Sequence, residues 1–174
     1  MNFRSFLLFT LLNCVNVISF SQHQSDPVKA ESTRRKEVQK LKDKHEKQIN
    51  KVIHTARTYF GTPYHEGGTS KKGIDAVGLV FRSYKSVGIT LPLDLEAQSK
   101  IGERKYIGEI ERGDLLFFSI SAGDEKLFSV GIVTGIENGN VYFIQCTSIG
   151  AVKEFKLNDP KWKDRYILTR RILE

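Results

Sequence analysis

Cysteine and histidine are the side chains that most often supply a nucleophile and a general base, and the chain contains two cysteines and four histidines. Cys146 follows Gln145 in a strand-like run. Because neighbours on a strand face opposite sides, these two side chains are expected to point apart, and Cys146 is interpreted as a buried core thiol. His65 lies in a polar loop, where a solvated side chain is expected; a substitute base is the alternative.

The spacing of the acidic, histidine and cysteine side chains matches no metal site, so neither a metal nor another cofactor is expected.

The chain has 174 residues, of which 40% are hydrophobic and 27% charged. This composition is typical of one globular domain with a short appendage. No apolar run reaches about 18 residues, which excludes a polytopic membrane protein.

The N-terminus has the organisation of a secretory signal peptide, predicted over residues 1–21. A basic start, Met1–Arg4, precedes a largely apolar run, Phe6–Phe20, and Ser19-Phe20-Ser21 offers small residues for cleavage. An uncleaved anchor is the alternative. Cys14 gives a faint lipoprotein pattern, so membrane attachment is expected only if it is lipidated. The chain is therefore expected to be exported, to the periplasm, the cell envelope or the medium, and nucleic acid is excluded as a partner.

A basic excess, 27 lysines and arginines against 20 aspartates and glutamates, gives a formal net charge of +7. This charge favours a polyanion, and by itself it does not distinguish nucleic acid, an acidic membrane surface and an anionic polymer such as bacterial cell wall. Residues 22–45 are assigned to a polar basic linker and the start of a helix. From Lys36 to Phe60 apolar residues recur every three or four positions, which predicts an amphipathic helix. Its lysines fall mostly on the other faces, so a solvated face is favoured over a polyanion site.

The elements after this helix change from helices to strands. Gly61-Thr62-Pro63 ends the first helix, a glycine-rich loop follows over 66–73, and Asp75 is placed to cap a second helix that runs to Gly88. Strands are predicted at 114–118, 128–133, 141–144 and 166–168, with a tight turn at 138–140. Helices first and strands later indicate an α+β fold.

At these residues the sequence resembles the NlpC family of papain-like bacterial cell-wall cysteine peptidases. The resemblance runs from about Ala56 to the C-terminus. It rests on several short motifs in the same order and at similar spacing. These are Gly61-Thr62-Pro63-Tyr64, Gly67-Gly68-Thr69, Asp75-Ala76-Val77-Gly78-Leu79-Val80, Leu91-Pro92 with Gln98, Gly113-Asp114-Leu115-Leu116-Phe117-Phe118, Ser129-Val130-Gly131-Ile132, and the tail from Trp162 to Leu173 with Arg170-Arg171.

The resemblance implies a papain-like NlpC-type domain over residues 46–174. In that fold, N-terminal helices pack on an antiparallel sheet, one helix carries the nucleophile at its start, and the sheet supplies the base. It also implies a substrate class, the stem peptides of peptidoglycan, cleaved next to D-glutamate.

The catalytic side chains that the resemblance implies are replaced in this sequence. The family's nucleophilic cysteine falls on Ala76, and the neighbouring serine of its motif falls on Val77. The family's base falls on Ser129 and its third polar position on Gln145. A methyl group cannot attack a carbonyl, and a serine hydroxyl cannot usefully accept a proton near neutral pH. Loss of one member of a working triad typically costs about 10⁴ to 10⁶ in turnover.

A ligand groove is nevertheless expected from the resemblance. The N-terminal amides of the second helix would attract a carboxylate. Asp75 could contact a ligand or cap the helix, and both readings remain open. The residues expected to line the groove are Tyr64, His65, Asp75, Ala76, Val77, Ser129 and Gln145.

The functional hypothesis is an exported, catalytically inactive homologue that binds stem peptides or a cell-envelope protein. One alternative is an active cell-wall peptide hydrolase that uses Cys146 or His65. The other is a structural or interaction protein with a vestigial groove, in which the basic helix Lys36–Lys51 makes the contacts.

Overall fold

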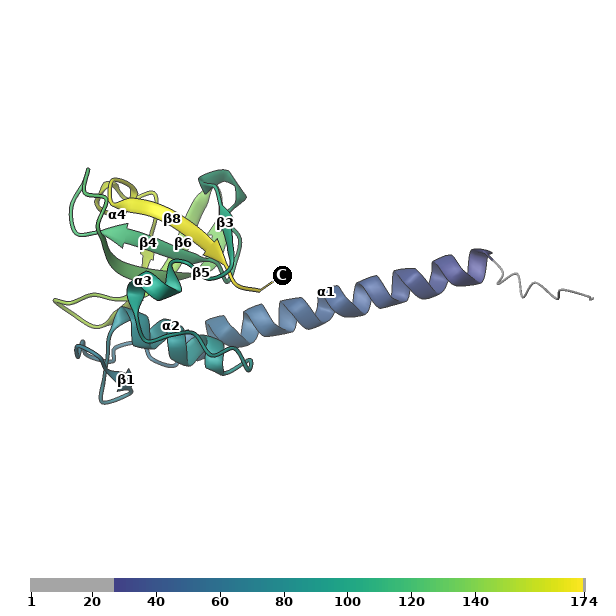
Figure 1. Ribbon diagram of the computed structural model, residues 1–174, viewed down its shortest axis with the longest axis horizontal. Coiled ribbons are helices and arrows are strands. Elements are labelled where there is room, and N and C mark those ends of the chain that lie inside the picture. The colour runs from purple at the N-terminus through teal and green to yellow at the C-terminus, as the bar shows by residue number, and fades with distance from the viewer. Residues whose placement is uncertain (1–26, 174) are drawn as a thin grey trace, which may run out of the picture. The chain divides into compact units, whose positions relative to one another are not determined.

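The structure, a computed structural model, describes residues 27–173. The predicted signal peptide, residues 1–21, and Cys14 lie outside the described residues. The chain divides into two compact units, residues 1–37 and 38–174. The structure describes the first unit from residue 27, as the N-terminal part of helix α1. The second unit holds the rest of α1 and all the elements that follow (Figure 1).

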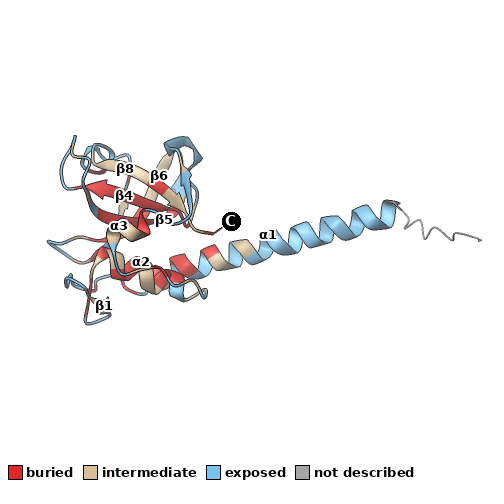
Figure 2. Ribbon diagram, in the orientation of Figure 1, coloured by how far each residue is buried: buried red, intermediate tan, exposed pale blue. Residues whose placement is uncertain are grey.

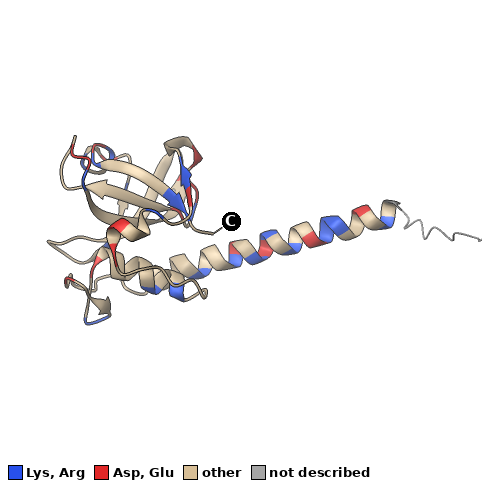
Figure 3. Ribbon diagram, viewed as in Figure 1, with Lys and Arg blue, Asp and Glu red and all other residues tan. Residues whose placement is uncertain are grey.

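Helix α1 runs from Pro27 to Arg57, so the predicted start at Lys36 was wrong. Its first turns contain few apolar residues and therefore show no hydrophobic periodicity from which a helix could be predicted. They are instead suited to a helix by the proline at the first position and by an ion pair one turn apart, Glu31–Arg35 at 2.9 Å. Lysines, arginines and acidic residues alternate along α1 (Figure 3). Buried side chains begin only at Ile49 (Figure 2).

The helix that was expected to start within the segment 22–45 begins at Pro27. The domain boundary at residue 46 stays a prediction. Between residues 27 and 173, no helix is both long and apolar enough to cross a bilayer.

The predicted α+β fold with an antiparallel sheet is confirmed. Six strands pair in the order β3-β8-β4-β5-β6-β7, and every pair is antiparallel. A separate hairpin joins β1 and β2. The strands are β1 Thr69–Ser70, β2 Gly73–Ile74, β3 Glu103–Lys105, β4 Leu115–Ser119, β5 Leu127–Glu137, β6 Asn140–Cys146, β7 Val152–Lys156 and β8 Tyr166–Arg171. The remaining helices are α2 Ala76–Lys85, α3 Leu95–Gln98, the 3₁₀ helix η1 Ile107–Glu109, and α4 Pro160–Lys163.

The predicted strands and the second helix are present, with shifted ends. Helix α2 ends at Lys85, before Gly88, whose positive φ of 84° stops any continuation. The turn between β5 and β6 is confirmed, with Asn138 and Gly139 both at positive φ. Strands β3 and β7 and the hairpin of β1 and β2 were missed, the hairpin inside what was predicted as a loop. They are short or largely exposed, so they show little alternation between apolar and polar residues.

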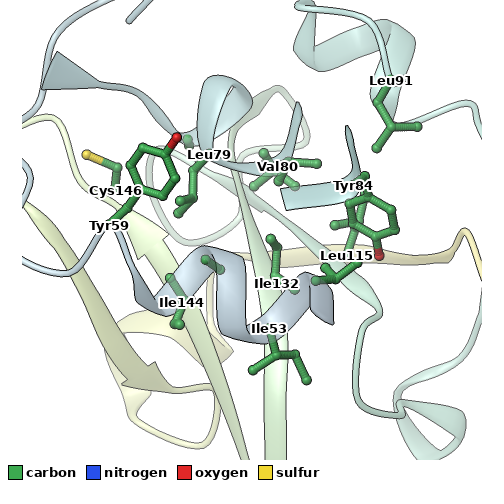
Figure 4. Packing of buried hydrophobic residues seen from close by; sticks show 14 of the residues in the cluster. Ile53, Tyr59, Leu79, Val80, Tyr84, Leu91, Leu115, Ile132, Ile144 and Cys146 are labelled. Atoms are coloured by element: carbon green, nitrogen blue, oxygen red, sulfur yellow. The ribbon is translucent and has the colours of Figure 1, made fainter. Parts of the chain in front are cut away.

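The main core packs the second half of α1 and helix α2 on one face of the sheet (Figure 4). Ile53 from α1, Leu79 and Val80 from α2, and Ile132 and Ile144 from the sheet are all buried in it. The three- and four-residue spacing of the apolar positions on both helices creates this shared face.

A second, aromatic core lies on the opposite face of the sheet. Phe118 from β4, Phe143 from β6, Phe155 from β7 and Trp162 from α4 meet there, with ring centroids 4.9–5.8 Å apart. Because α4 has only four residues, its place on the sheet depends on this packing.

Candidate functional site

The start of α2 is built around Asp75. Its Oδ1 accepts from the Gly78 amide at 2.6 Å, which caps the helix, and its Oδ2 accepts from the Gly67 amide at 2.8 Å. Both carboxylate oxygens are therefore engaged inside the protein, and the aspartate ties the glycine-rich loop to the helix. The loop approaches so closely that a Cβ on Gly78 would overlap the carbonyl oxygen of Gly68.

Ala76 is the first residue of α2, the position expected for the nucleophile. It is buried in the main core and presents only a methyl group. Val77 beside it is half-buried, and its carbonyl accepts a hydrogen bond from the buried Gln98 amide at 3.2 Å. The start of the helix thus keeps its support but offers no side chain that could attack a carbonyl.

Tyr64 and His65 lie beside this helix start. Tyr64 pairs with Ile74, and burial, then the nearby Glu66 and Asp75, raise its pKa. His65 is exposed, and its Nδ1 lies 2.9 Å from the carbonyl of the next residue, Glu66. Tyr64 therefore stays a neutral hydrogen-bonding phenol at ordinary pH.

Ser129 and Gln145, the predicted base and orienting positions, lie together on the sheet. The Gln145 amide donates to the Ser129 hydroxyl, and Gln145 is only 1% exposed. The Gln145 Oε1 is buried with no hydrogen-bond partner between residues 27 and 173. The two side chains thus contact each other directly, although neither accepts a proton near neutral pH.

The prediction that Cys146 and Gln145 face apart is confirmed. Cys146 belongs to the core cluster under α2, together with Val130. Ser129 pairs with Phe118 across the ladder, on the face that carries the aromatic core. Since neighbours on a strand alternate, Gln145 and Ser129 lie on that aromatic face as well.

The predicted site residues consequently form two groups. Tyr64, His65, Asp75, Ala76 and Val77 gather at the start of α2. Ser129 and Gln145 instead line a pocket of about 280 Å³ on the other face of the sheet. Among the described residues lining that pocket are none of the five at the helix start.

The rest of the pocket was missed by sequence reasoning. The end of β4, the start of β5, the loop after β6 and the segment around α4 converge on it. Its cationic side chains are Lys161 and Arg165, on either side of Trp162. No spacing in the sequence links positions near 120, 149 and 161, and only the order of the strands in the sheet brings them together.

The structure holds no candidate for a metal centre between residues 27 and 173, where no three histidine, cysteine or acidic side chains converge.

The described thiol, Cys146, is buried, and its Sγ donates to the Ile74 carbonyl at 3.1 Å. Burial and, secondarily, Asp75 raise the pKa of the Cys146 thiol to about 11. The group is therefore protonated at neutral pH, unlike a nucleophilic cysteine, whose pKa is lowered.

We expect native Cys146 to react with Ellman's reagent at pH 8 about 100-fold more slowly than after unfolding in urea, because raising a thiol pKa from 9 to 11 lowers its thiolate fraction by about that factor. Burial of the thiol would slow the reaction with the reagent further. The measurement uses a chain carrying Cys14→Ser, so that Cys146 is the single thiol. Equal rates in the folded and unfolded chain would contradict the buried position.

Comparisons with known proteins all point to one protein family. Residues 61–171 match the model of the NlpC/P60 family. The murein DD-endopeptidase MepS/murein LD-carboxypeptidase of Escherichia coli strain K12 is 33% identical over 114 residues. The match covers 65% of this chain and 57% of that protein, so the chain spans little more than half of the relative's length.

Solved structures show the same fold. An NlpC/P60 family protein from Bacillus cereus superposes with a TM-score of 0.66 at 31% identity, over 72% of this chain and 40% of that one. RipD from Mycobacterium tuberculosis gives a TM-score of 0.57 at 22% identity, over 72% of this chain and 98% of that one. RipD is described as a non-catalytic NlpC/p60 domain protein with an adaptation to peptidoglycan binding.

Proposed function

The chain belongs to the NlpC/P60 family, and from that premise we propose that it is an exported family member that binds peptidoglycan stem peptides without cleaving them. The observation that carries the proposal is Ala76 at the first position of α2, together with Ser129 and Gln145 at the two sheet positions expected to hold a base and its orienting group. A cysteine peptidase needs a thiolate and a base, and neither is present at these positions.

The relatives support the choice of ligand. The E. coli relative is named for hydrolysis of murein, so its substrate class is the natural candidate for this chain. RipD shares the fold alone with this chain, and its description makes a binding role compatible with that fold. A location in the cell envelope or outside the cell, after removal of the signal peptide 1–21, belongs to the same proposal.

Hydrolysis by a displaced nucleophile is the less favoured function. Cys146 is buried, protonated and hydrogen-bonded to a backbone carbonyl. His65 is exposed at the start of α2 and has no thiol partner in any described hydrogen bond. Neither arrangement supplies the paired nucleophile and base that the reaction requires.

The test incubates the purified protein with defined stem peptides and analyses the products by mass spectrometry, while co-sedimentation with insoluble peptidoglycan measures binding. We expect intact peptides, with turnover at least about 10⁴-fold below that of the E. coli relative, and retention of the protein on peptidoglycan. New fragments, absent from a heat-killed sample, would overturn the proposal. If those fragments disappeared with Cys146→Ser, the displaced thiol would be identified as the nucleophile.

A further inference from the structure

The pocket on the aromatic face of the sheet is distinct from the helix start that should carry the nucleophile. Its wall on one side is the segment around α4, with Lys161, Trp162 and Arg165. Ser129 and Gln145 lie on the strands of the sheet within it. Its volume of about 280 Å³ is enough for one or two amino-acid residues of a ligand.

The charge of this pocket has one sign. Lys161 and Arg165 contribute the charged groups, and no described acidic residue lines it. Within residues 27–173 neither cation forms an ion pair, although six other lysines and arginines do. The Lys161 Nζ lies 5.5 Å from the centre of the Trp162 ring, which holds the ammonium over the pocket wall. Two unpaired cations beside a low-dielectric aromatic wall favour an anionic ligand.

The rim of the pocket is apolar. Ile120, Phe128 and Ile149 are 52%, 50% and 91% exposed, and all three line it. Three large exposed apolar side chains around one concavity are a feature of ligand and partner sites rather than of an ordinary surface. A ligand that covers them must itself carry apolar groups.

The polar groups in the pocket are neutral and suit an amide. The buried Gln145 carboxamide uses one amide hydrogen on Ser129, while its Oε1 has no partner among the described residues. An unpaired buried carbonyl of this kind destabilises the protein until it accepts a hydrogen bond. A small rotation of the side chain would present it to an N–H donor in the pocket. A peptide supplies this donor together with carboxylate and apolar groups.

We propose that this pocket binds an acidic peptide, with a carboxylate directed to Lys161 and Arg165 and an apolar side chain packed on Phe128 and Ile149. The inference rests on the proposed function, because stem peptides are acidic peptides, and it deepens that function by moving the ligand contacts from the start of α2 to the wall formed by α4. Trp162 is the single tryptophan of the chain and lines the pocket, so its emission reports on occupancy.

The test titrates the protein with the tripeptide alanyl-γ-glutamyl-diaminopimelate at physiological salt and follows Trp162 emission. We expect a saturable change and at least about tenfold weaker binding with Lys161→Glu or with Arg165→Glu, since each removes a charge-assisted contact. Amidation of the ligand carboxylates should have a similar effect. Lys163→Glu is the matched control: it makes the same charge change on the same short helix, outside the pocket lining, and should alter affinity less than about twofold at a Debye length of about 8 Å.

Ile149→Ser is a second probe that leaves the fold intact, because this side chain is 91% exposed; we expect it to weaken binding as well. If the tripeptide binds but Lys161→Glu and Lys163→Glu behave alike, the pocket proposal is overturned and the proposed function stands. Binding by calorimetry without a change in Trp162 emission would likewise place the ligand elsewhere. If neither the tripeptide nor insoluble peptidoglycan is bound, the proposed function fails and this inference with it.

Discussion

Replacing Arg171 by alanine is expected to lower the free energy of unfolding by about 3–5 kcal/mol. Arg171 reaches the Asp114 carboxylate with two hydrogen bonds, at 2.8 and 2.9 Å, and Asp114 is only 1% exposed. The same guanidinium pairs with Glu111 at 2.8 Å and donates to the Glu109 carbonyl at 2.7 Å. Alanine would leave a buried carboxylate whose remaining described partner is the amide of Glu111.

The control is Arg35→Ala. Arg35 also pairs with a carboxylate at 2.9 Å, but both side chains of that pair are largely exposed on α1, so a loss below about 1 kcal/mol is expected. Urea denaturation followed by Trp162 emission measures both variants. Because the cost in Arg171→Ala comes from an unpaired charge, adding Asp114→Ala should cost less than the sum of the two single changes. Equal losses in the two arginine variants would show that the buried pair contributes no more than a surface pair.

The fold was predictable where periodicity is strong. The strand at 115–119 has nearly continuous apolar residues, and the strand at 127–137 is rich in them. The turn at Asn138-Gly139 needs the positive φ that these two residue types tolerate. The first turns of α1 were not predictable in this way, because a solvated polar helix shows no hydrophobic stripe. Strand β7 is an edge strand with mostly exposed side chains, so its pairing with β6 is set by topology more than by pattern.

The residues of the candidate site likewise differ in how far the sequence predicts them. Ala76 and Asp75 were predictable because a cap and the first turn of a helix are local, and the capping bond to Gly78 is present. The resemblance assigned the family's base and third polar position to Ser129 and Gln145, and their direct hydrogen bond is a finding of the structure that the sequence did not predict. The cationic wall was not predictable, because Lys161 and Arg165 reach the pocket through tertiary contacts: the packing of Trp162 in the aromatic core and the hydrogen bonds that the Arg165 carbonyl accepts from Ser119.

Under the proposed function, the loss of catalysis and the retention of the framework depend on different residues of this chain. Ala76 offers no nucleophile and does not disturb the helix, because alanine is the best helix former and fits the buried first position. By contrast, the cap at Asp75 and the close approach of Gly68 to Gly78 are needed to hold the loop in place. This combination agrees with the proposed binding function, since a binding surface needs the shape of the site but not reactive atoms.

Replacing Trp162 by alanine is expected to lower the free energy of unfolding by about 3–5 kcal/mol and to abolish binding in the pocket. Trp162 is 6% exposed, and its ring meets Phe118, Phe143 and Phe155 with centroids 4.9–5.2 Å apart. Helix α4 is a single turn whose cap residue, Asp159, makes no side-chain capping bond. A helix of this length is not stable alone, so its position on the sheet depends on the packing of the indole, together with the hydrogen bonds that the Arg165 carbonyl accepts from Ser119.

Circular dichroism in urea measures this variant, because the fluorescent reporter is lost. Trp162→Phe keeps an aromatic ring in the cluster and should recover more than half of the stability, while Phe128→Ala, at the half-exposed rim, should cost less than about 1.5 kcal/mol. A binding measurement separates the role of Trp162 in stability from its role in the pocket. Phe128→Ala should weaken binding of the acidic peptide in a nearly native fold, whereas Trp162→Ala should lose both stability and binding. If Trp162→Ala unfolded at the same urea concentration as the parent chain, α4 would be held by other contacts, and the wall it forms would not depend on the aromatic core.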